Sequence, residues 1–590
     1  MRILLGVVLL LMSLPVAAET ITYSVSFSPS THYLEVEANM PAGSPVVTLP
    51  VWTPGSYKVR DYSGQVENMQ AYDPAGTPIA TQKVRKNRWQ VASPGAYNLK
   101  YRIYAHEPSV RNNWVDQEYA LIVGAATFVT PFERGPFDYR VQLELPSEWQ
   151  SSYSGLAEVG PNTFGAADYD ELVDCPILAG NPAVYTFTVG GKPHYLVNVG
   201  EAGVWDGPGS ARDVKKVVET QLALWGQLPY DKYLFFNIIN ETHGGLEHRN
   251  STVLMTSLWK RQTEQHQAWC SLVAHEFFHA WNVKRLRPVE LGPFDYENEV
   301  YTRSLWVAEG ITSYYDDLLV ARAGLANEAD YLKALSKSVE RLQTTPGRKV
   351  RSLAEASFDA WIKLYAPDEN TNNTNISYYT KGALVSWLLD IEIRQATGGQ
   401  KTLDDLLRLA YQRFAKDGFE EQAFRQLASE VAGKDLSGFF SRNVDSTQEL
   451  DYAPALTYFG LRFKPPENQA NPAGWLGAKL ATDNFVTEVP RDTPAYRASL
   501  QPGDELLGLD QFRLPPDGLE ERLKQYAPGT QVELLVARRG RLFRLPARLE
   551  GKPTQTWTLE PDPAANPTQT ARRNQWLGSS KTANQPATTR

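Results

Sequence analysis

The sequence predicts a multidomain α+β protein in which an all-β segment is followed by a mainly helical segment and then by a second β-rich one. Its 590 residues exceed what one hydrophobic core usually holds, which indicates roughly three to four domains. With 42% hydrophobic, 11% aromatic and 21% charged residues, the composition excludes a disordered or fibrous chain. The hydrophobic periodicity changes twice along the chain and places the domain boundaries.

Residues 19–203 are expected to form an N-terminal, β-sandwich-like domain. The stretches 21–27 and 97–104 alternate apolar and polar side chains with period two, as half-buried strands do. Clusters of proline, glycine and asparagine separate such runs, as in a β-sandwich.

Helical periodicity dominates residues 204–457. The stretch 214–225 places apolar side chains at helical spacing, and similar stretches recur further along this segment. The apolar run 233–239 suits a strand. We therefore expect this domain to begin as mixed α/β structure and to continue mainly as helix.

A second β-rich domain is expected over residues 458–550. A tight turn at Pro502-Gly503-Asp504 leads into an apolar strand, and 532–541 is typical of a strand and hairpin. The remainder, 551–590, is rich in Pro, Thr, Asn and Gln and is expected to be a loose tail, with Trp576-Leu577 as its candidate docking point.

The first 18 residues are expected to be a secretory signal peptide. Arg2 supplies a positive charge, residues 3–14 a short apolar core, and Val16-Ala17-Ala18 the small residues before the cleavage site. The apolar core is well short of the roughly 20 residues that span a bilayer, so we expect no stable membrane insertion. These features predict export, specifically to a bacterial periplasm.

Charge and cysteine content narrow the function classes. The net charge of −8 is mild, and the longest basic cluster is only Lys284-Arg285-Leu286-Arg287, so no nucleic-acid partner is expected. Cys175 and Cys270 can either pair in an exported protein or remain buried thiols, and both alternatives stay open.

The clearest chemical signal is the pair His275 and His279, four residues apart on a segment with helical patterning. This spacing places both imidazoles on one helix face, where they can bind one ion. Glu276 beside them is the candidate general base, because zinc lowers the pKa of its bound water to roughly 7 and a carboxylate can then accept the proton. The alternative is a chance match, which is weak in a chain with only eight histidines.

A catalytic zinc site needs a third protein ligand and one open position. A histidine six residues after His279 would indicate a metzincin, but that position is Arg285, and Asn282 occupies the place of the required glycine. The third ligand is therefore expected to be a carboxylate.

Two regions offer that carboxylate. Glu297 and Glu299 flank the spacing that is usual for a glutamate ligand, but Asn298 occupies that spacing and the stretch is loop-like. Glu309 lies in the helical segment 305–315 and is the predicted third ligand. An exposed helix carboxylate is the alternative interpretation of Glu309.

The stretch 275–288 (HEFFHAWNVKRLRP) resembles the signature of the glycyl aminopeptidase family, which are gluzincin zinc metallopeptidases with a C-terminal PDZ domain. Residues 306–310 (WVAEG) resemble the third-ligand motif of that family, and 52–57 (WTPGSY) and 572–576 (RRNQW) also match. The resemblance covers nearly the whole mature chain. It implies a thermolysin-like, mainly helical catalytic domain, a PDZ-like C-terminal domain and one Zn²⁺ per chain.

Wider relatives, the alanyl aminopeptidases, bind a free substrate amine with a Gly-x-Met-Glu-Asn loop, which Gly244-Gly245-Leu246-Glu247-His248 resembles. The resemblance implies that Glu247 binds the N-terminal ammonium, with Gly244 and Gly245 beside it. A carboxylate at a fixed distance from zinc would allow only the first peptide bond to reach the metal. His248 departs from the pattern, and an ordinary surface turn is the alternative.

The same relatives carry a tyrosine two residues before a Lys-Gly pair, which Tyr379 matches ahead of Lys381-Gly382. The resemblance implies that Tyr379 donates a hydrogen bond to the oxyanion, with Tyr378 as the alternative donor.

In the PDZ-like segment, Leu476 and Gly477 within Trp475-Leu476-Gly477-Ala478 resemble a carboxylate-binding loop. Such a domain could add the C-terminal peptide of a partner as an extra strand. A domain that only packs on the peptidase is the alternative.

The sequence thus predicts a zinc aminopeptidase that acts on peptides with a free N-terminus, and the resemblance implies glycine or alanine as the residue removed. One alternative is a zinc endopeptidase of the cell envelope. The other is a non-catalytic envelope protein that binds peptides through its PDZ domain, against which the intact Glu276 argues.

Overall fold

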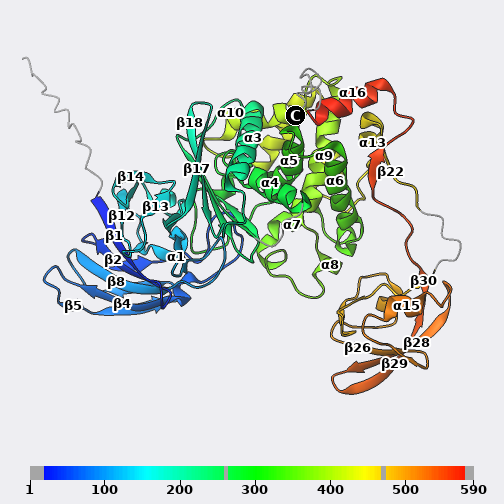
Figure 1. Cartoon of the computed structure of the whole chain (residues 1–590), viewed down its shortest axis with the longest axis horizontal. Helices are drawn as coiled ribbons and strands as arrows, with labels where there is room; N and C mark the ends of the chain where they lie inside the picture. The colour runs from blue at the N-terminus through cyan, green and yellow to red at the C-terminus, as the bar shows by residue number, and fades with distance from the viewer. Residues whose placement is uncertain (1–18, 258–262, 467–472, 579–590) are drawn as a thin grey trace, which may run out of the picture. The chain divides into compact units, whose positions relative to one another are not determined.

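The computed structural model describes residues 19–257, 263–466 and 473–578 (Figure 1). The expected signal peptide lies outside these residues. The chain divides into two compact units, of which the first comprises residues up to Val51 together with Asp61–Pro182. The second comprises Trp52–Arg60 and the chain from Ala183 onward.

The first unit is rich in β-structure, as predicted. Its largest sheet has the strand order β14-β15-β12-β1-β2-β8-β4-β5. Strands β1 (Glu19–Ser28) and β8 (Tyr97–Tyr104) alternate buried and more exposed residues, which confirms both period-two predictions. The other strands of this sheet are β2 (Tyr33–Met40), β4 (Val66–Tyr72), β5 (Pro78–Ile79), β12 (Phe137–Glu144), β14 (Ala157–Gly160) and β15 (Thr163–Ala166).

Two smaller sheets complete this unit, with the orders β13-β16-β10-β9 and β11-β3-β7-β6. Their strands are β3 (Val46–Thr48), β6 (Thr81–Arg85), β7 (Arg88–Val91), β9 (Trp114–Val115), β10 (Tyr119–Ile122), β11 (Thr130–Pro131), β13 (Ser151–Ser154) and β16 (Ile177–Gly180).

The first unit ends at Pro182, about twenty residues before the predicted boundary at 203. Strands β17 (Ala183–Val189) and β18 (Lys192–Val199) belong instead to a sheet of the second unit, with the order β17-β18-β19-β21-β20. The physical reason is that β18 pairs in parallel with β19 (Tyr233–Ile239), a strand distant in sequence. Strand propensity alone does not specify this partner.

The second unit contains the mainly helical lobe that the sequence predicted. The apolar run 233–239 is the fully buried strand β19, and β21 (Ser251–Thr256) pairs in parallel with it. Strand β20 (Gly244–Glu247) pairs antiparallel with β21 and forms the edge of the sheet. The principal helices are α3 (Gly207–Trp225), α4 (Thr263–Phe278), α5 (Ile311–Arg322), α6 (Glu328–Gln343), α7 (Leu353–Phe358), α9 (Tyr378–Ala396), α10 (Leu403–Phe414), α11 (Glu421–Ala432), α12 (Ser437–Asn443) and α13 (Ala453–Phe459).

Helices α4, α5 and α9 lie side by side in this lobe, α4 against α5 and α5 against α9 (Figure 1). Among the described residues, no helix is both long and apolar enough to cross a membrane. Cys175 and Cys270 are both buried, and burial raises the pKa of the Cys270 thiol to about 12.

A small β-rich part follows the helical lobe, with its own hydrophobic core drawn from residues between Leu476 and Leu549. Its main sheet has the order β27-β26-β28-β29. The predicted hairpin is formed by β28 (Gln531–Arg538) and β29 (Arg541–Arg548), joined by Arg539 and Gly540 with φ of 51° and 76°, the left-handed conformation of a tight two-residue turn. The other strands are β23 (Gly474–Trp475), β24 (Lys479–Leu480), β25 (Val486–Glu488), β26 (Glu505–Leu509), β27 (Phe512–Arg513) and β30 (Glu550–Gly551).

The prediction of a loose tail over 551–590 was wrong for much of that segment. Strand β31 (Leu559–Pro561) pairs with β22 (Leu461–Phe463), and helix α16 (Pro567–Trp576) follows. Trp576 is completely buried and stacks on Phe459, with ring centroids 4.2 Å apart. The polar composition of the C-terminal segment predicted disorder, but burial of one large aromatic side chain anchors helix α16.

Replacement of Trp576 by alanine should destabilise the helical lobe by about 3–5 kcal/mol, because it leaves a large cavity in the core. It also removes the hydrogen bond of 2.9 Å that the indole Nε1 donates to Tyr314 Oη. Denaturant unfolding of the full chain would measure the change. Thr568→Ala on the exposed side of α16 is the control, and we expect it to stay within about 0.5 kcal/mol. An unchanged midpoint for Trp576→Ala would contradict the anchoring role.

Candidate metal centre and substrate cleft

Helix α4 brings the two histidines of the motif to a single carboxylate. His275 lies in its last turn and His279 directly after its end. The Nε2 atoms of His275 and His279 lie 3.4 Å and 3.2 Å from Oε2 of Glu309. Tetrahedral zinc with bonds of about 2.0–2.1 Å separates its ligand atoms by about 3.3 Å. The three side chains therefore have the donor types and the spacing that a zinc ion requires.

Hydrogen bonds on the far side of each ring orient the two imidazoles. Nδ1 of His279 donates to the backbone carbonyl oxygen of Asn282 at 2.6 Å, which leaves the lone pair of Nε2 facing Glu309. Nδ1 of His275 lies 3.2 Å from Oδ2 of Asp316. Outer partners of this kind set the tautomer and basicity of metal-binding histidines. Neither partner is predicted from the sequence, although Asp316 follows Glu309 by two helical turns.

Glu309 lies in η3 (Trp306–Gly310), a single π-helical turn that leads into α5. Such turns are frequent at functional sites because they re-aim a side chain within a helix. Glu309 is only 2% exposed, which excludes the exposed-carboxylate alternative. Burial opposes its ionisation, but the imidazoles of His279 and His275 lower the pKa of Glu309 to about 2. Within the described residues, Glu309, and not Glu297 or Glu299, is the carboxylate opposite the histidines.

Glu276 is buried beside the same cluster and faces strand β20. A Cβ atom added to Gly245 would lie 2.0 Å from Oε1 of Glu276, so only glycine allows this approach. Burial, assisted by the charges of Glu247 and Glu309, raises the pKa of Glu276 to about 7 against the opposing charges of the two histidines. A carboxyl group with a pKa near neutrality can both accept and release a proton during catalysis.

Glu247 lies at the end of edge strand β20 and is 3% exposed, so it is not part of an ordinary surface turn. Its carboxylate lies within 4.8 Å of ligand atoms of Glu276 and His279. Nζ of Lys284 lies 3.7 Å from its Oε1, a buried charge pair that the sequence analysis did not identify. A negative charge is therefore held a short distance from the candidate metal position.

The segment Trp52–Arg60 forms part of this environment. Gly55 has a φ of +87°, and a Cβ atom there would lie 2.5 Å from Oε1 of Glu247. Burial raises the pKa of Tyr57, and the charges of Glu309 and Glu247 add to that effect, so the phenol lies near both carboxylates and stays protonated. The sequence matched this segment to a family motif but indicated no role for it.

The first residues of α9 supply two tyrosines in different settings. Tyr378 is completely buried, whereas Tyr379 lines the cleft beside Glu276. The hydroxyl oxygens of Tyr379 and Tyr365 lie 3.0 Å apart, and the ring of Tyr379 lies 6.2 Å from that of His275. Burial raises the pKa of Tyr379, with Glu309 adding to the shift, so its hydroxyl remains a hydrogen-bond donor.

Two glycines position α9 against the Glu309 segment. A Cβ atom on Gly310 would lie 2.6 Å from Cα of Gly382, and a Cβ atom on Gly382 would lie 2.8 Å from Cα of Gly310. This close backbone approach holds Tyr379 at the start of α9 in a fixed relation to Glu309. It accounts for the glycine of the Lys381-Gly382 pair that the sequence analysis noted.

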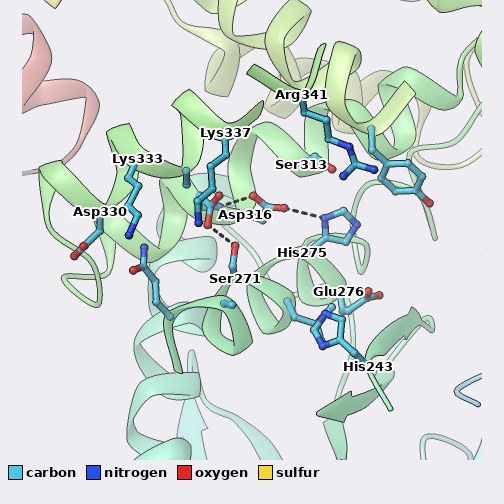
Figure 2. A pocket seen from close by; sticks show the side chains of 16 residues that line it. His243, Ser271, His275, Glu276, Ser313, Asp316, Asp330, Lys333, Lys337 and Arg341 are labelled. Atoms are coloured by element: carbon cyan, nitrogen blue, oxygen red, sulfur yellow. Dashed lines mark hydrogen bonds and ion pairs between the residues drawn. The ribbon is translucent and has the colours of Figure 1, made fainter. Parts of the chain in front are cut away.

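A cleft with a volume of about 640 Å³ opens beside these groups (Figure 2). Helix α4 lines it with His275 and Glu276, helix α5 with Asp316, and helix α6 with a row of charged side chains. A volume of this size is typical of sites for small ligands and accommodates a short peptide.

Comparisons with known proteins identify a peptidase family and related solved structures. Residues 268–385 match the M61 glycyl aminopeptidase family, and residues 22–181 match the N-terminal domain of M61 peptidases. A solved aminopeptidase N family protein from Idiomarina loihiensis is 29% identical, with 94% of this chain and 100% of that chain covered and a TM-score of 0.87.

A more distant solved structure is an M1 zinc metallopeptidase from Deinococcus radiodurans. It is 14% identical, with 74% of this chain and 95% of that chain covered and a TM-score of 0.47. No curated protein matches the chain.

Removal of a predicted metal ligand should abolish stoichiometric metal binding. We expect His279→Ala and Glu309→Gln to lose bound zinc and Asp316→Asn to weaken zinc affinity about 10- to 100-fold, because Asp316 only orients His275. Metal analysis after dialysis would measure both effects. Glu299→Gln, which alters the rejected alternative ligand, should retain the metal; retention by Glu309→Gln with loss in Glu299→Gln would reverse the ligand assignment.

Proposed function

Because the chain belongs to the M61 glycyl aminopeptidase family and is a metallo-aminopeptidase, we propose that it removes single small residues from the N-terminus of peptides. One observation carries the choice of an exopeptidase. The buried carboxylate of Glu247 lies within 4.8 Å of Glu276 and His279, where it can pair with a substrate ammonium. An endopeptidase would need to pass an uncharged peptide through that position.

The metal in this proposal is one zinc ion per chain, held by His275, His279 and Glu309. When bound, zinc supplies Lewis acidity that acidifies a water molecule and polarises the scissile carbonyl. The fit of the donor atoms to tetrahedral zinc supports the assignment.

Glu276 acts in this proposal as general base and then as general acid. It accepts a proton from the attacking water and passes that proton to the leaving amine. Its burial and its pKa of about 7 support both halves of that transfer. Tyr379 donates a hydrogen bond to the oxygen on which negative charge develops, and its position on the cleft wall favours it over the fully buried Tyr378.

Glu247 binds the substrate ammonium and so aligns the first peptide bond with Glu276. The backbone of Gly55 lies against the Glu247 carboxylate, and Tyr57 is buried nearby. This close packing against Glu247, together with the family match, supports glycine or alanine as the residue removed. The glycines Gly244 and Gly245 leave the edge strand β20 open to the substrate backbone.

The remaining parts of the proposal concern the C-terminal domain and the location. Within the predicted segment 458–550, we assign the part with its own core, between Leu476 and Leu549, to a PDZ-like domain in which Leu476 and Gly477 would bind the terminal carboxylate of a peptide. A core of its own and a four-stranded antiparallel sheet support that assignment. Export to the periplasm rests on residues 1–18.

Glu276→Gln should keep its zinc and lose about 10²–10⁴-fold in kcat, because the amide can neither accept nor return the proton. Hydrolysis of glycine, alanine and leucine 4-nitroanilides would measure activity and residue preference, and metal analysis would show that the site is intact. Leucine cleaved as well as glycine would contradict the small-residue preference. Full turnover by the variant would exclude the assigned base.

Glu247→Ala should impair substrates with a free N-terminus far more than blocked ones. We expect a loss of about 10²-fold or more in kcat/KM for glycyl peptides, since a buried charge pair with the ammonium is lost. The same peptides with an acetylated N-terminus provide the comparison, and Glu241→Ala, an exposed carboxylate nearby, is the matched control. Equal losses of kcat/KM on free and acetylated peptides would contradict the role assigned to Glu247 and favour an endopeptidase.

A further inference from the structure

The cleft beside the candidate metal centre continues well past the groups assigned to catalysis. From Glu276 and Tyr379 it extends over α4 and α5 to helix α6 (Figure 2). The proposed mechanism uses only its inner end, so the outer part can bind a portion of the substrate that is remote from the reacting bond.

Strand β20 indicates which portion of the substrate that is. On the proposed function, the N-terminal residue lies at Glu247, the last residue of the strand. His243, which precedes the strand at its other end, lines the cleft, whereas Glu247 does not. An extended substrate that follows the edge strand therefore directs its leaving-group portion into this cleft.

The three aspartates that line the cleft already contact other groups of the protein. Asp316 contacts Nδ1 of His275 at 3.2 Å, and Asp317 accepts a hydrogen bond of 2.6 Å from Ser271 Oγ. Asp330 accepts a hydrogen bond of 3.2 Å from the backbone N–H of Asn327 in the capping box of α6. These acidic groups thus serve the metal-site histidine, the packing of α4 on α5 and a helix end.

The cations of the cleft are arranged differently. Lys333, Lys337 and Arg341 follow one another at four-residue intervals and so share one face of α6. Lys337 and Arg341 extend from α6 toward the part of the cleft where Asp316 and His275 lie (Figure 2). In the part of the chain that the structure describes, neither forms an ion pair within 4.0 Å. Burial raises the pKa of the Asp317 carboxyl to about 7, and the charge of Lys337 nearby opposes that rise.

We propose that Lys337 and Arg341 form a carboxylate-binding subsite on the leaving-group side of the cleft. The enzyme would then favour peptides with a negative charge beyond the scissile bond. The C-terminal carboxylate of a short peptide and an acidic side chain both supply that charge. The proposal depends on the proposed function only for the direction in which the substrate lies.

The test compares substrates that differ only in this charge. One arm pairs glycyl peptides of two to four residues as free acids with their C-terminal amides. A second arm pairs Gly-Gly-Glu-amide with Gly-Gly-Gln-amide, which moves the charge to a side chain. We expect kcat/KM to be about 3- to 10-fold higher for the charged member of a pair, mainly through KM, and the ratio to fall with added salt.

Variants test whether the two cations cause the ratio of kcat/KM between charged and uncharged substrates. Arg341→Gln and Lys337→Gln should bring it close to one, and Arg341→Glu should invert it, because a carboxylate at that position repels the substrate charge. The ratio is taken within each enzyme, so a loss of folded protein cancels. Lys215→Gln, which alters a solvent-exposed side chain of α3 outside the cleft, should leave both the activity and the ratio unchanged.

The outcomes separate this proposal from the general one. Glycine 4-nitroanilide carries no carboxylate, so failure to cleave it would count against the aminopeptidase function. Cleavage of it with charge ratios near one in both arms would overturn the subsite alone, as would ratios that Arg341→Gln and Arg341→Glu leave unchanged. A ratio above one in only the first arm identifies the terminal carboxylate of short peptides as the ligand. A ratio above one in both arms shows that the subsite binds a carboxylate from either source.

Discussion

The structure of the site depends on the buried carboxylate of Glu309 opposite the imidazoles of His275 and His279. Side chains this deeply buried are costly to keep charged unless an opposite charge or a metal compensates them. The helices that carry them must therefore meet at one point, and the π-helical turn at η3 directs Glu309 there. The outer contacts with Asp316 and Asn282 then hold the imidazoles in position.

Close backbone approaches at glycine place the remaining groups around that centre. Gly245 admits Glu276, Gly55 lies against Glu247, and Gly310 with Gly382 brings α9 and Tyr379 to the Glu309 segment. In each case a Cβ atom would collide with the functional group or with the backbone that supports it. Preorganisation of this kind reduces the reorganisation that catalysis would otherwise require.

The balance of charge distinguishes the two sides of the proposed cleft. On the side of the substrate amine, the carboxylate of Glu247 lies near the candidate metal position, and Lys284 lies 3.7 Å from it. On the leaving-group side, the carboxylates are engaged within the protein and the cations of α6 line the outer wall. A short peptide is itself a dipole with a positive N-terminus and a negative C-terminus, so the two sides together suit its orientation.

The sequence by itself predicted the residues of the candidate centre and the order of the β-rich and helical segments. The four-residue spacing of His275 and His279, with Glu276 between them, requires only local helix geometry, and period-two alternation predicted β1 and β8 for the same reason. Only the tertiary structure decided that β17 and β18 belong with the helical lobe and that the polar segment before Trp576 forms helix α16. It also decided that Lys284, Asp316 and Gly55 surround the site. Those relations join residues far apart in the chain, and local periodicity carries no information about which distant surfaces pack together.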